Sequence, residues 1–164
     1  MTNDSISRDD IMKIIPHRPP MLLLDEGELI DGISTCKYTV KGDEFFLQGH
    51  FPGNPVVPGV IQCEMMAQAS CLLVGESPTH SSPAPLNGTA RHHNSTPDNN
   101  HMPNRTPYFT GMEKVKFKRK VIPGDCLVLR SELVKQKGPF YFVKCTGHVN
   151  DELCCTAEIS FALM

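Results

Sequence analysis

An almost wholly apolar run, VIQCEMMAQASCLLV, occupies residues 60–74. Pro58 and Gly59 precede it, and because proline is well tolerated in the first turn of a helix, we expect a helix from about residue 58 to 74. A helix that is apolar nearly all round has to be buried, since hardly any face of it suits contact with water. The rest of the chain must therefore supply a surface that surrounds it.

Strand patterns lie on both sides of this run. Residues 21–30 and 33–40 predict two strands joined at Asp31-Gly32, a dipeptide that favours a tight hairpin turn. From Gly111 onward, alternating apolar residues indicate three or four further strands. In the last strand the alternating residues are Cys155, Ala157, Ile159, Phe161 and Leu163. An antiparallel sheet with one apolar face needs a cover, so we predict an α+β fold in which the sheet curls around the 58–74 helix.

The length of 164 residues suits one domain. Residues 5–15 predict a short amphipathic helix with Ser7 as its N-cap. Residues 76–107 hold six of the 14 prolines and four of the seven histidines, with almost nothing to pack in a core. We interpret them as a mobile, low-complexity insertion in the single domain 1–164. Its histidines lack carboxylate partners and helical spacing, so we predict no metal site.

Charge and cysteine content limit the class of protein. A net charge of −2 gives no electrostatic reason to expect a nucleic-acid partner. The seven cysteines are odd in number, include the adjacent pair Cys154-Cys155 and form no CxxC motif, which indicates reduced thiols and a cytoplasmic setting. The N-terminal residues are polar and acidic, and no apolar run reaches the length of a membrane span, so we expect neither a signal peptide nor membrane insertion.

The loop GHFPGNPVVPG, residues 49–59, carries one group that titrates near neutral pH, His50. Its three prolines restrict the backbone and so hold the histidine in place at little entropic cost during turnover. Gly59 opens the helix, where free backbone N–H groups point outward and no side chain blocks them. Such donors can hold a carbonyl oxygen that gains negative charge. The alternative is that His50 only bridges the loop backbone.

The apolar helix contains one carboxylate, Glu64, and Gln68 lies on the same side of it four residues later. Loss of water favours the neutral form of a carboxyl group, so we expect a raised pKa for Glu64 and a role as general acid. The alternative is a structural ion pair with an arginine or lysine. Cys63 and Cys71 have no base beside them in sequence, so no activated nucleophile is predicted. A base, an acid and an oxyanion site together suit proton transfer beside a carbonyl.

Three segments resemble a known family: PHRPPMLLLDE (16–26), FFLQGHFPGNPVVPGVIQCEMMAQ (45–68) and VKFKRKVIPGD (115–125). They are similar to the FabZ-type 3-hydroxyacyl-[acyl-carrier-protein] dehydratases, and the spacing from His50 to Glu64 matches without a gap. The resemblance implies the hot-dog fold, an antiparallel sheet curled around one long central helix. The related FabA-type enzymes, which also isomerise their product, have aspartate at the position of Glu64, so the non-isomerising type is favoured.

The resemblance also implies roles for individual residues. His50 and Glu64 would be the catalytic pair, contributed by opposite protomers of a homodimer that is often part of a trimer of dimers. The further substrate-binding residues implied are Phe51, Gly59, Gln68 and Tyr108. Of these, Gly59 N–H would bind the thioester carbonyl, Gln68 would support Glu64, and Tyr108 is the candidate for a gate.

The function expected from this resemblance is dehydration of an (R)-3-hydroxyacyl thioester to the trans-2-enoyl thioester in fatty-acid or related lipid or polyketide biosynthesis. No cofactor is expected, because the substrate arrives on the phosphopantetheine arm of its partner, acyl carrier protein. Two alternatives stay open. One is a hot-dog acyl thioesterase, which would release a free thiol, and the other is a non-catalytic acyl-carrier binding protein.

Overall fold

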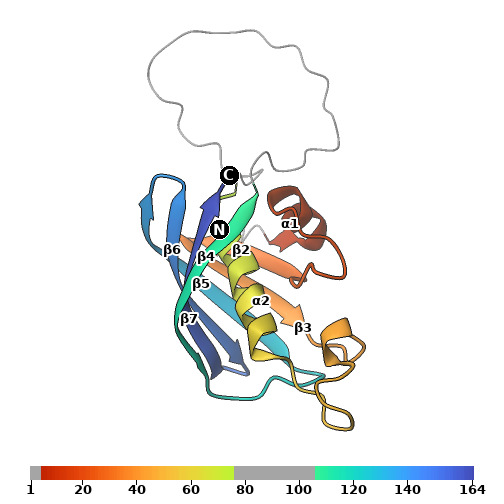
Figure 1. Cartoon of the computed structure of the whole chain (residues 1–164). Helices are drawn as coiled ribbons and strands as arrows, with labels where there is room; N and C mark the ends of the chain where they lie inside the picture. The colour runs from red at the N-terminus through yellow and green to blue at the C-terminus, as the bar shows by residue number, and fades with distance from the viewer. Residues whose placement is uncertain (1–4, 76–105) are drawn as a thin grey trace, which may run out of the picture.

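The computed structural model describes residues 5–75 and 106–164. In these residues seven strands form one antiparallel sheet in the order β1-β2-β3-β5-β6-β7-β4, and helix α2 lies across one face of it (Figure 1). The strands are β1 (Ile6–Ser7), β2 (Glu26–Ile30), β3 (Ile33–Thr39), β4 (Pro107–Phe117), β5 (Cys126–Lys137), β6 (Phe140–Val149) and β7 (Glu152–Leu163). The helices are α1 (Arg8–Ile14), the short 3-10 helix η1 (Phe45–Leu47) and α2 (Gly59–Cys71).

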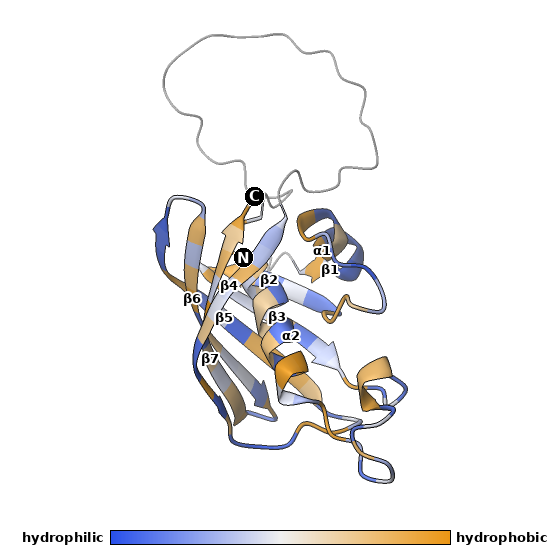
Figure 2. Ribbon diagram, viewed as in Figure 1, coloured by the Kyte–Doolittle hydropathy of each residue, from blue (hydrophilic) through white to orange (hydrophobic). Residues whose placement is uncertain are grey.

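The apolar run at 60–74 forms the core of the molecule, as predicted. Met65 and Met66 on α2 are 0% exposed, and Leu129 on β5 and Ile159 on β7 are buried beneath the helix at 0% and 2%. Figure 2 shows apolar residues on α2 and in alternating bands along the strands. Period-two alternation gives the sheet one apolar face, and α2 removes that face from water. The predicted α+β architecture, a sheet curled around one central helix, is confirmed.

The turn at Asp31-Gly32 joins β2 to β3 as predicted. Asp31 and Gly32 both have positive φ, 50° and 76°, and Ile30 pairs directly with Ile33. This is the two-residue hairpin whose twist matches that of the strands. At the N-terminus, Ser7 caps α1 by accepting a hydrogen bond from the Asp10 N–H (3.2 Å), also as predicted.

The strand predicted at 21–30 begins only at Glu26, so its first half is a correction. Leu22, Leu23 and Leu24 are buried at 1% or less, which explains why their apolar pattern looks like a strand. Their segment instead exchanges hydrogen bonds with the side chain of Gln68 on α2: the Leu23 N–H donates to Oε1 (2.9 Å) and Nε2 donates to the Met21 carbonyl (2.7 Å). The side chain of Gln68 thus makes the backbone hydrogen bonds that a neighbouring strand would make.

Most of the insertion predicted at 76–107 lies outside the described residues, which resume at Thr106. Pro107 already begins β4, and the backbone of Thr106 pairs with that of Met164. Strand β4 is the last in the sheet order, so one of its edges pairs with no other strand of residues 5–75 and 106–164. Within residues 5–75 and 106–164, no helix is both long and apolar enough to cross a membrane.

Candidate active site

The loop that carries His50 is held by its own backbone. The Phe51 and Asn54 N–H groups each donate to the other's carbonyl (3.2 and 2.9 Å), which closes a turn beside the histidine. The Val56 N–H donates to the His50 carbonyl (2.9 Å), and the Val57 N–H donates to the Val121 carbonyl (2.8 Å), which ties the loop to the segment after β4. The position of His50 therefore depends on hydrogen bonds within the fold rather than on sequence neighbours alone.

One nitrogen of the His50 imidazole is hydrogen-bonded within the loop, and the other is available to a ligand. Nδ1 lies 2.8 Å from the Val56 carbonyl oxygen. Because a carbonyl can only accept, Nδ1 carries the hydrogen, and in the neutral ring Nε2 keeps its lone pair. The Phe51 ring stacks on the imidazole, with ring centroids 4.1 Å apart and 25° between the planes. This arrangement presents Nε2 as a base of fixed orientation.

Helix α2 begins beside this histidine with unused backbone donors. The N–H groups of Ile61 and Gln62 donate to the Pro58 carbonyl (3.0 and 3.1 Å), whereas those of Gly59 and Val60 find no acceptor among the described residues. The Phe117 ring covers Gly59 so closely that an added Cβ would lie 2.6 Å from ring atom Cζ. Glycine is therefore needed here for packing as well as for access to the helix end.

His50, Gly59, Val60 and Phe117 line one cavity of about 580 Å³. Lys118, Arg119 and Lys120 complete its wall. Arg119 is held by Asp125 (2.9 Å) and by Glu152 (2.9 Å), while Lys118 and Lys120 are exposed. The cavity thus combines a base, free N–H donors and a positively charged rim.

Glu64 lies in a different and much smaller cavity, of about 40 Å³, lined also by His17, Gln68, Cys71 and Phe109 among others. Gln68 Nε2 donates to Glu64 Oε1 (2.9 Å), and His17 Nε2 lies 3.3 Å from the same oxygen. The sequence placed Glu64 and Gln68 on one side of the helix, and the contact between them is present. His17 was not predicted to take part.

The expected raised pKa of Glu64 is wrong. The hydrogen bond from His17 lowers the pKa of Glu64, burial acts in the opposite direction, and the hydrogen bond from Gln68 lowers it further, so the net shift is downward. The carboxyl group is therefore ionised at neutral pH in the single chain. The partner is also neither the arginine nor the lysine considered from the sequence, but a histidine from the segment before β2.

The single chain does not bring all the predicted site residues together. His50 with Gly59 and Glu64 with Gln68 line separate cavities. Tyr108 on β4 is 52% exposed and lines neither cavity, so its role as a gate stays a prediction. Phe51 is 53% exposed and contacts His50 by stacking.

Sequence reasoning missed two residues of the site, His17 and Phe117. His17 belongs to the segment PHRPPMLLLDE that carried part of the family resemblance, but it lies 47 positions before Glu64. The one available signal was physical: a carboxylate in an apolar helix needs a donor, and His17 was a candidate close to the buried leucines. Phe117 had no signal beyond its place in an alternating strand.

The cysteines offer no activated nucleophile. All seven are free, and burial raises the pKa of Cys36 to about 11 and those of Cys71 and Cys155 to about 12. Burial also raises the pKa of Cys63 on α2. These thiols are neutral near pH 7 and therefore weakly nucleophilic. In the described part of the chain, no group of three or more His, Cys, Asp or Glu residues is placed to hold a metal ion.

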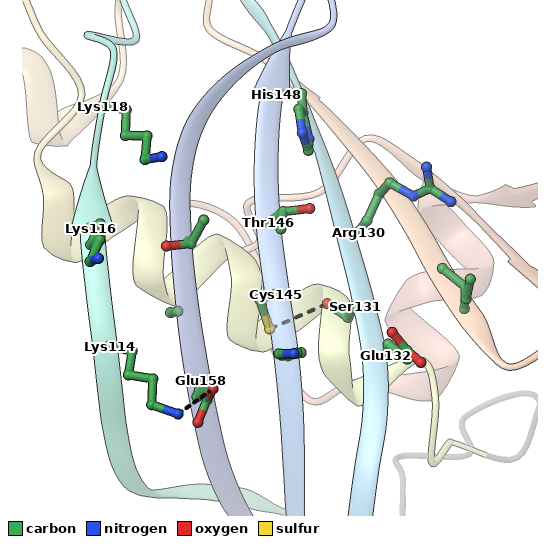
Figure 3. Close-up of a pocket in the computed structure, with 14 residues that line it drawn as sticks. Lys114, Lys116, Lys118, Arg130, Ser131, Glu132, Cys145, Thr146, His148 and Glu158 are labelled. Atoms are coloured by element: carbon green, nitrogen blue, oxygen red, sulfur yellow. Dashed lines mark hydrogen bonds and ion pairs between the residues drawn. The ribbon is translucent and has the colours of Figure 1, made fainter.

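A third hollow, of about 530 Å³, lies on the outer face of the sheet and contains none of the predicted site residues (Figure 3). Its charges alternate across the strands: Glu132 is opposite Lys144, Lys144 is opposite Glu158, and Lys114 forms an ion pair with Glu158 (2.9 Å). Such alternation is typical of a solvated sheet face. We therefore place the candidate active site at the two cavities beside α2.

Comparison with known proteins adds a family to this geometry. A family model described as FabA-like domain matches residues 15–158. The chain is 37% identical over 156 residues to a 3-hydroxyacyl-[acyl-carrier-protein] dehydratase FabZ of Clostridium perfringens. The match covers 94% of this chain and 96% of that protein. It is 36% identical over 159 residues to the protein of the same name from Caldicellulosiruptor saccharolyticus, with 93% and 95% covered.

Among solved structures, the dehydratase heterocomplex ApeI:P of Xenorhabdus doucetiae is similar in fold. The TM-score is 0.70 at 20% identity, and the match covers 94% of this chain and 91% of that one. At this identity the likeness supports the fold and carries no argument about the substrate.

Proposed function

Because this chain belongs to the FabA-like family, we propose that His50 and Glu64 serve it in the dehydration of (R)-3-hydroxyacyl thioesters to trans-2-enoyl thioesters in fatty acid biosynthesis. Curated relatives that match it over nearly their whole length are named 3-hydroxyacyl-[acyl-carrier-protein] dehydratases. The observation that carries the residue assignment is the His50 cavity, where an unprotonated Nε2 and the free N–H groups of α2 line the same space. The chain acts as one domain in this proposal.

The reaction proceeds by two proton transfers. His50 Nε2 takes a proton from C2 of the substrate, and the electron pair of that C–H bond forms the C2–C3 double bond as the C3–O bond breaks. The Gly59 and Val60 N–H groups stabilise the negative charge that develops on the thioester oxygen. The departing hydroxyl receives a proton, directly or through water, from the protonated form of Glu64 and leaves as water. This form is the minor one at neutral pH because the pKa of Glu64 is lowered. Since the steps are proton transfers and loss of water, with no oxidation or reduction, the proposal needs no cofactor.

The partner of His50 in this proposal is Glu64 of a second copy of the chain. Within one chain the two side chains line separate cavities. The free edge strand β4 exposes apolar side chains that a partner would cover, with Phe109 at 45%, Met112 at 47% and Phe117 at 50% exposure. Because Phe109 lines the Glu64 cavity and Phe117 the His50 cavity, pairing two β4 edges would join the cavities of the two copies.

Acyl carrier protein is the proposed source of the substrate. Lys118 and Lys120 are exposed at the rim of the His50 cavity, where they can meet the phosphate of a phosphopantetheine arm. Seven free cysteines, six of them buried and none paired, suit the reducing cytoplasm, which is the location we infer.

Two substitutions test the catalytic assignment. His50→Ala and Glu64→Gln should each remove most hydration of a crotonyl thioester, the reverse reaction, while circular dichroism and the unfolding temperature stay close to those of the original protein. His148→Ala is the matched control, because His148 lines the hollow on the outer face of the sheet and lines neither active-site cavity. Undiminished hydration in either active-site variant would refute the assignment. Release of free thiol in the same samples would indicate a thioesterase instead.

A further inference from the structure

The two oxygens of Glu64 are in different situations. Oε1 accepts a hydrogen bond from Gln68 Nε2 at 2.9 Å and lies 3.3 Å from His17 Nε2. Oε2 has no hydrogen-bond partner among the described residues. The Glu64 side chain is 20% exposed, so the carboxyl group is partly accessible. Two donors on one oxygen fix the plane of the carboxylate and leave the other oxygen to act on a ligand.

We propose that His17 is a positioning residue for the dehydration reaction: its Nε2–H holds Oε1 of Glu64, so that Oε2 is the atom that exchanges a proton with the C3 hydroxyl of the substrate. The inference rests on the function proposed above. It assigns a role to a residue on the segment before β2, outside α2. Gln68 supplies the second donor to Oε1, but it cannot replace His17 because its amide also holds Met21 and Leu23.

The surroundings of His17 favour one protonation form of its ring. Nδ1 is buried and has no hydrogen-bond partner in the described part of the chain. An imidazolium would need an acceptor for an N–H at that atom, and leaving a buried donor unpaired is costly. The neutral ring with its hydrogen on Nε2 avoids this cost and still donates to Glu64. The geometry therefore fits the neutral ring as the donor to Glu64.

Few other charged groups face the pair. From α2, Cys71 lines the same cavity, but burial raises the pKa of its thiol to about 12, so it stays neutral. The guanidinium of Arg18, next in sequence, donates to the Ile15 and His17 carbonyls (3.0 and 2.7 Å) rather than to Glu64. The groups that β4 and β7 contribute are the uncharged side chains of Pro107, Phe109 and Phe161. Among the described residues, the pKa of Glu64 is therefore set by His17, which lowers it, by burial, which raises it, and by Gln68, which lowers it further.

The direction of the expected pH effect follows from the role of each group in hydration. In that direction Glu64 must be ionised to take a proton from water, and His50 must be protonated to deliver one to C2. The rate therefore falls on the acid side as Glu64 is protonated. Removing the donor at position 17 should raise the pKa of Glu64 and move the acid limb to higher pH.

Two variants separate this role from a purely structural one. His17→Leu removes the donor. His17→Gln keeps a neutral N–H donor, because its side-chain amide extends about as far as the imidazole Nε2. We expect His17→Leu to lower kcat for crotonyl-thioester hydration by about 10- to 100-fold with little change in KM, because the loss is in orientation. Its acid limb should move to higher pH, whereas His17→Gln should keep most of the rate and the original limb. The matched control is His148→Leu, outside both cavities, which should leave rate and profile unchanged.

A measurement without turnover keeps this inference separate from the proposed function. In the full-length protein labelled with ¹³C at glutamate carboxyls, the Glu64 resonance is identified by its loss in Glu64→Gln and titrated against pH. We expect a higher midpoint in His17→Leu than in the original protein and in His17→Gln. Equal midpoints in all three, or a His17→Leu enzyme with unaltered kcat and acid limb, would overturn the role of His17. Loss of the His50 or Glu64 requirement would instead overturn the function on which it rests.

Discussion

The carbonyl of Val56 determines which nitrogen of His50 can act as a base. It accepts a hydrogen bond from Nδ1 at 2.8 Å and so leaves the lone pair of the neutral ring on Nε2. Glu64 shows the same logic for an acid, because the donors on Oε1 set its charge more strongly than burial does. At the scale of single residues, the chemistry of this site depends on the few polar partners of His50 and Glu64.

Gly59 offers a test at this scale. In Gly59→Ala the new Cβ would lie 2.6 to 3.0 Å from three atoms of the Phe117 ring, so that ring must move across the cavity where the thioester is proposed to bind. Phe117 is 50% exposed and can give way, and we therefore expect a folded enzyme whose kcat/KM for thioester hydration falls by about 10-fold.

The double variant Gly59→Ala/Phe117→Ala is the control for this clash. If crowding by the ring is the cause, the loss of activity in the double variant should be smaller than the sum of the losses in Gly59→Ala and Phe117→Ala. A double-mutant cycle measures this difference. Strictly additive losses would show that the ring is not responsible.

At the scale of elements, the positions that fix the fold are the turns of the sheet and the buried helix. Gly32 tests the first hairpin: its φ of 76° is a conformation in which an alanine is strained, although no atom would touch the new Cβ. We expect Gly32→Ala to reduce the free energy of unfolding in urea by about 1 kcal/mol. Gly49→Ala is the control, because its Cβ would also meet open space and its φ is not positive. An equal cost in both variants would contradict this explanation.

Elements whose signal is local could be predicted from the sequence, and those held by distant partners could not. The alternation in β7, the Asp31-Gly32 turn and the apolar α2 follow from short-range patterns, and all three are present. The segment 21–25 looked like a strand because of its leucines, but its backbone bonds to Gln68, more than 40 positions away. The prediction of a raised pKa for Glu64 was wrong for the same reason, since its main donor, His17, is remote in sequence.

At the scale of the whole molecule, the six buried thiols make the stability of the fold depend on pH in the alkaline range. Burial raises the pKa of Cys36 to about 11 and those of Cys71 and Cys155 to about 12, against 9.0 for an exposed thiol. The folded state therefore holds these protons more tightly than the unfolded state, and the stability they contribute is complete below pH 9.0 and is lost as the pH rises toward the folded values.

We therefore expect the free energy of unfolding, measured with a reductant present, to fall above about pH 9 by up to about 1.4 kcal/mol per pH unit for each buried thiol. In Cys36→Ala this decline should be less steep by the contribution of one thiol, whatever free energy of unfolding the substitution costs at neutral pH. Cys126→Ala, at a half-buried position of β5, is the control and should leave the decline as it is. A curve for Cys36→Ala parallel to that of the original protein would argue against a thiol origin.

The division of the site between two cavities predicts how inactive chains should behave when mixed. If His50 of one copy works with Glu64 of another, a dimer of one His50→Ala chain and one Glu64→Gln chain has one site with both defects and one site that is intact. Random pairing makes half of the dimers mixed, with one working site in two, so mixing two inactive proteins after joint unfolding and refolding should restore about one quarter of the original activity. Mixing without subunit exchange should restore none. If both residues acted within a single chain, every site in the mixture would lack one of them, and the refolded sample would stay inactive.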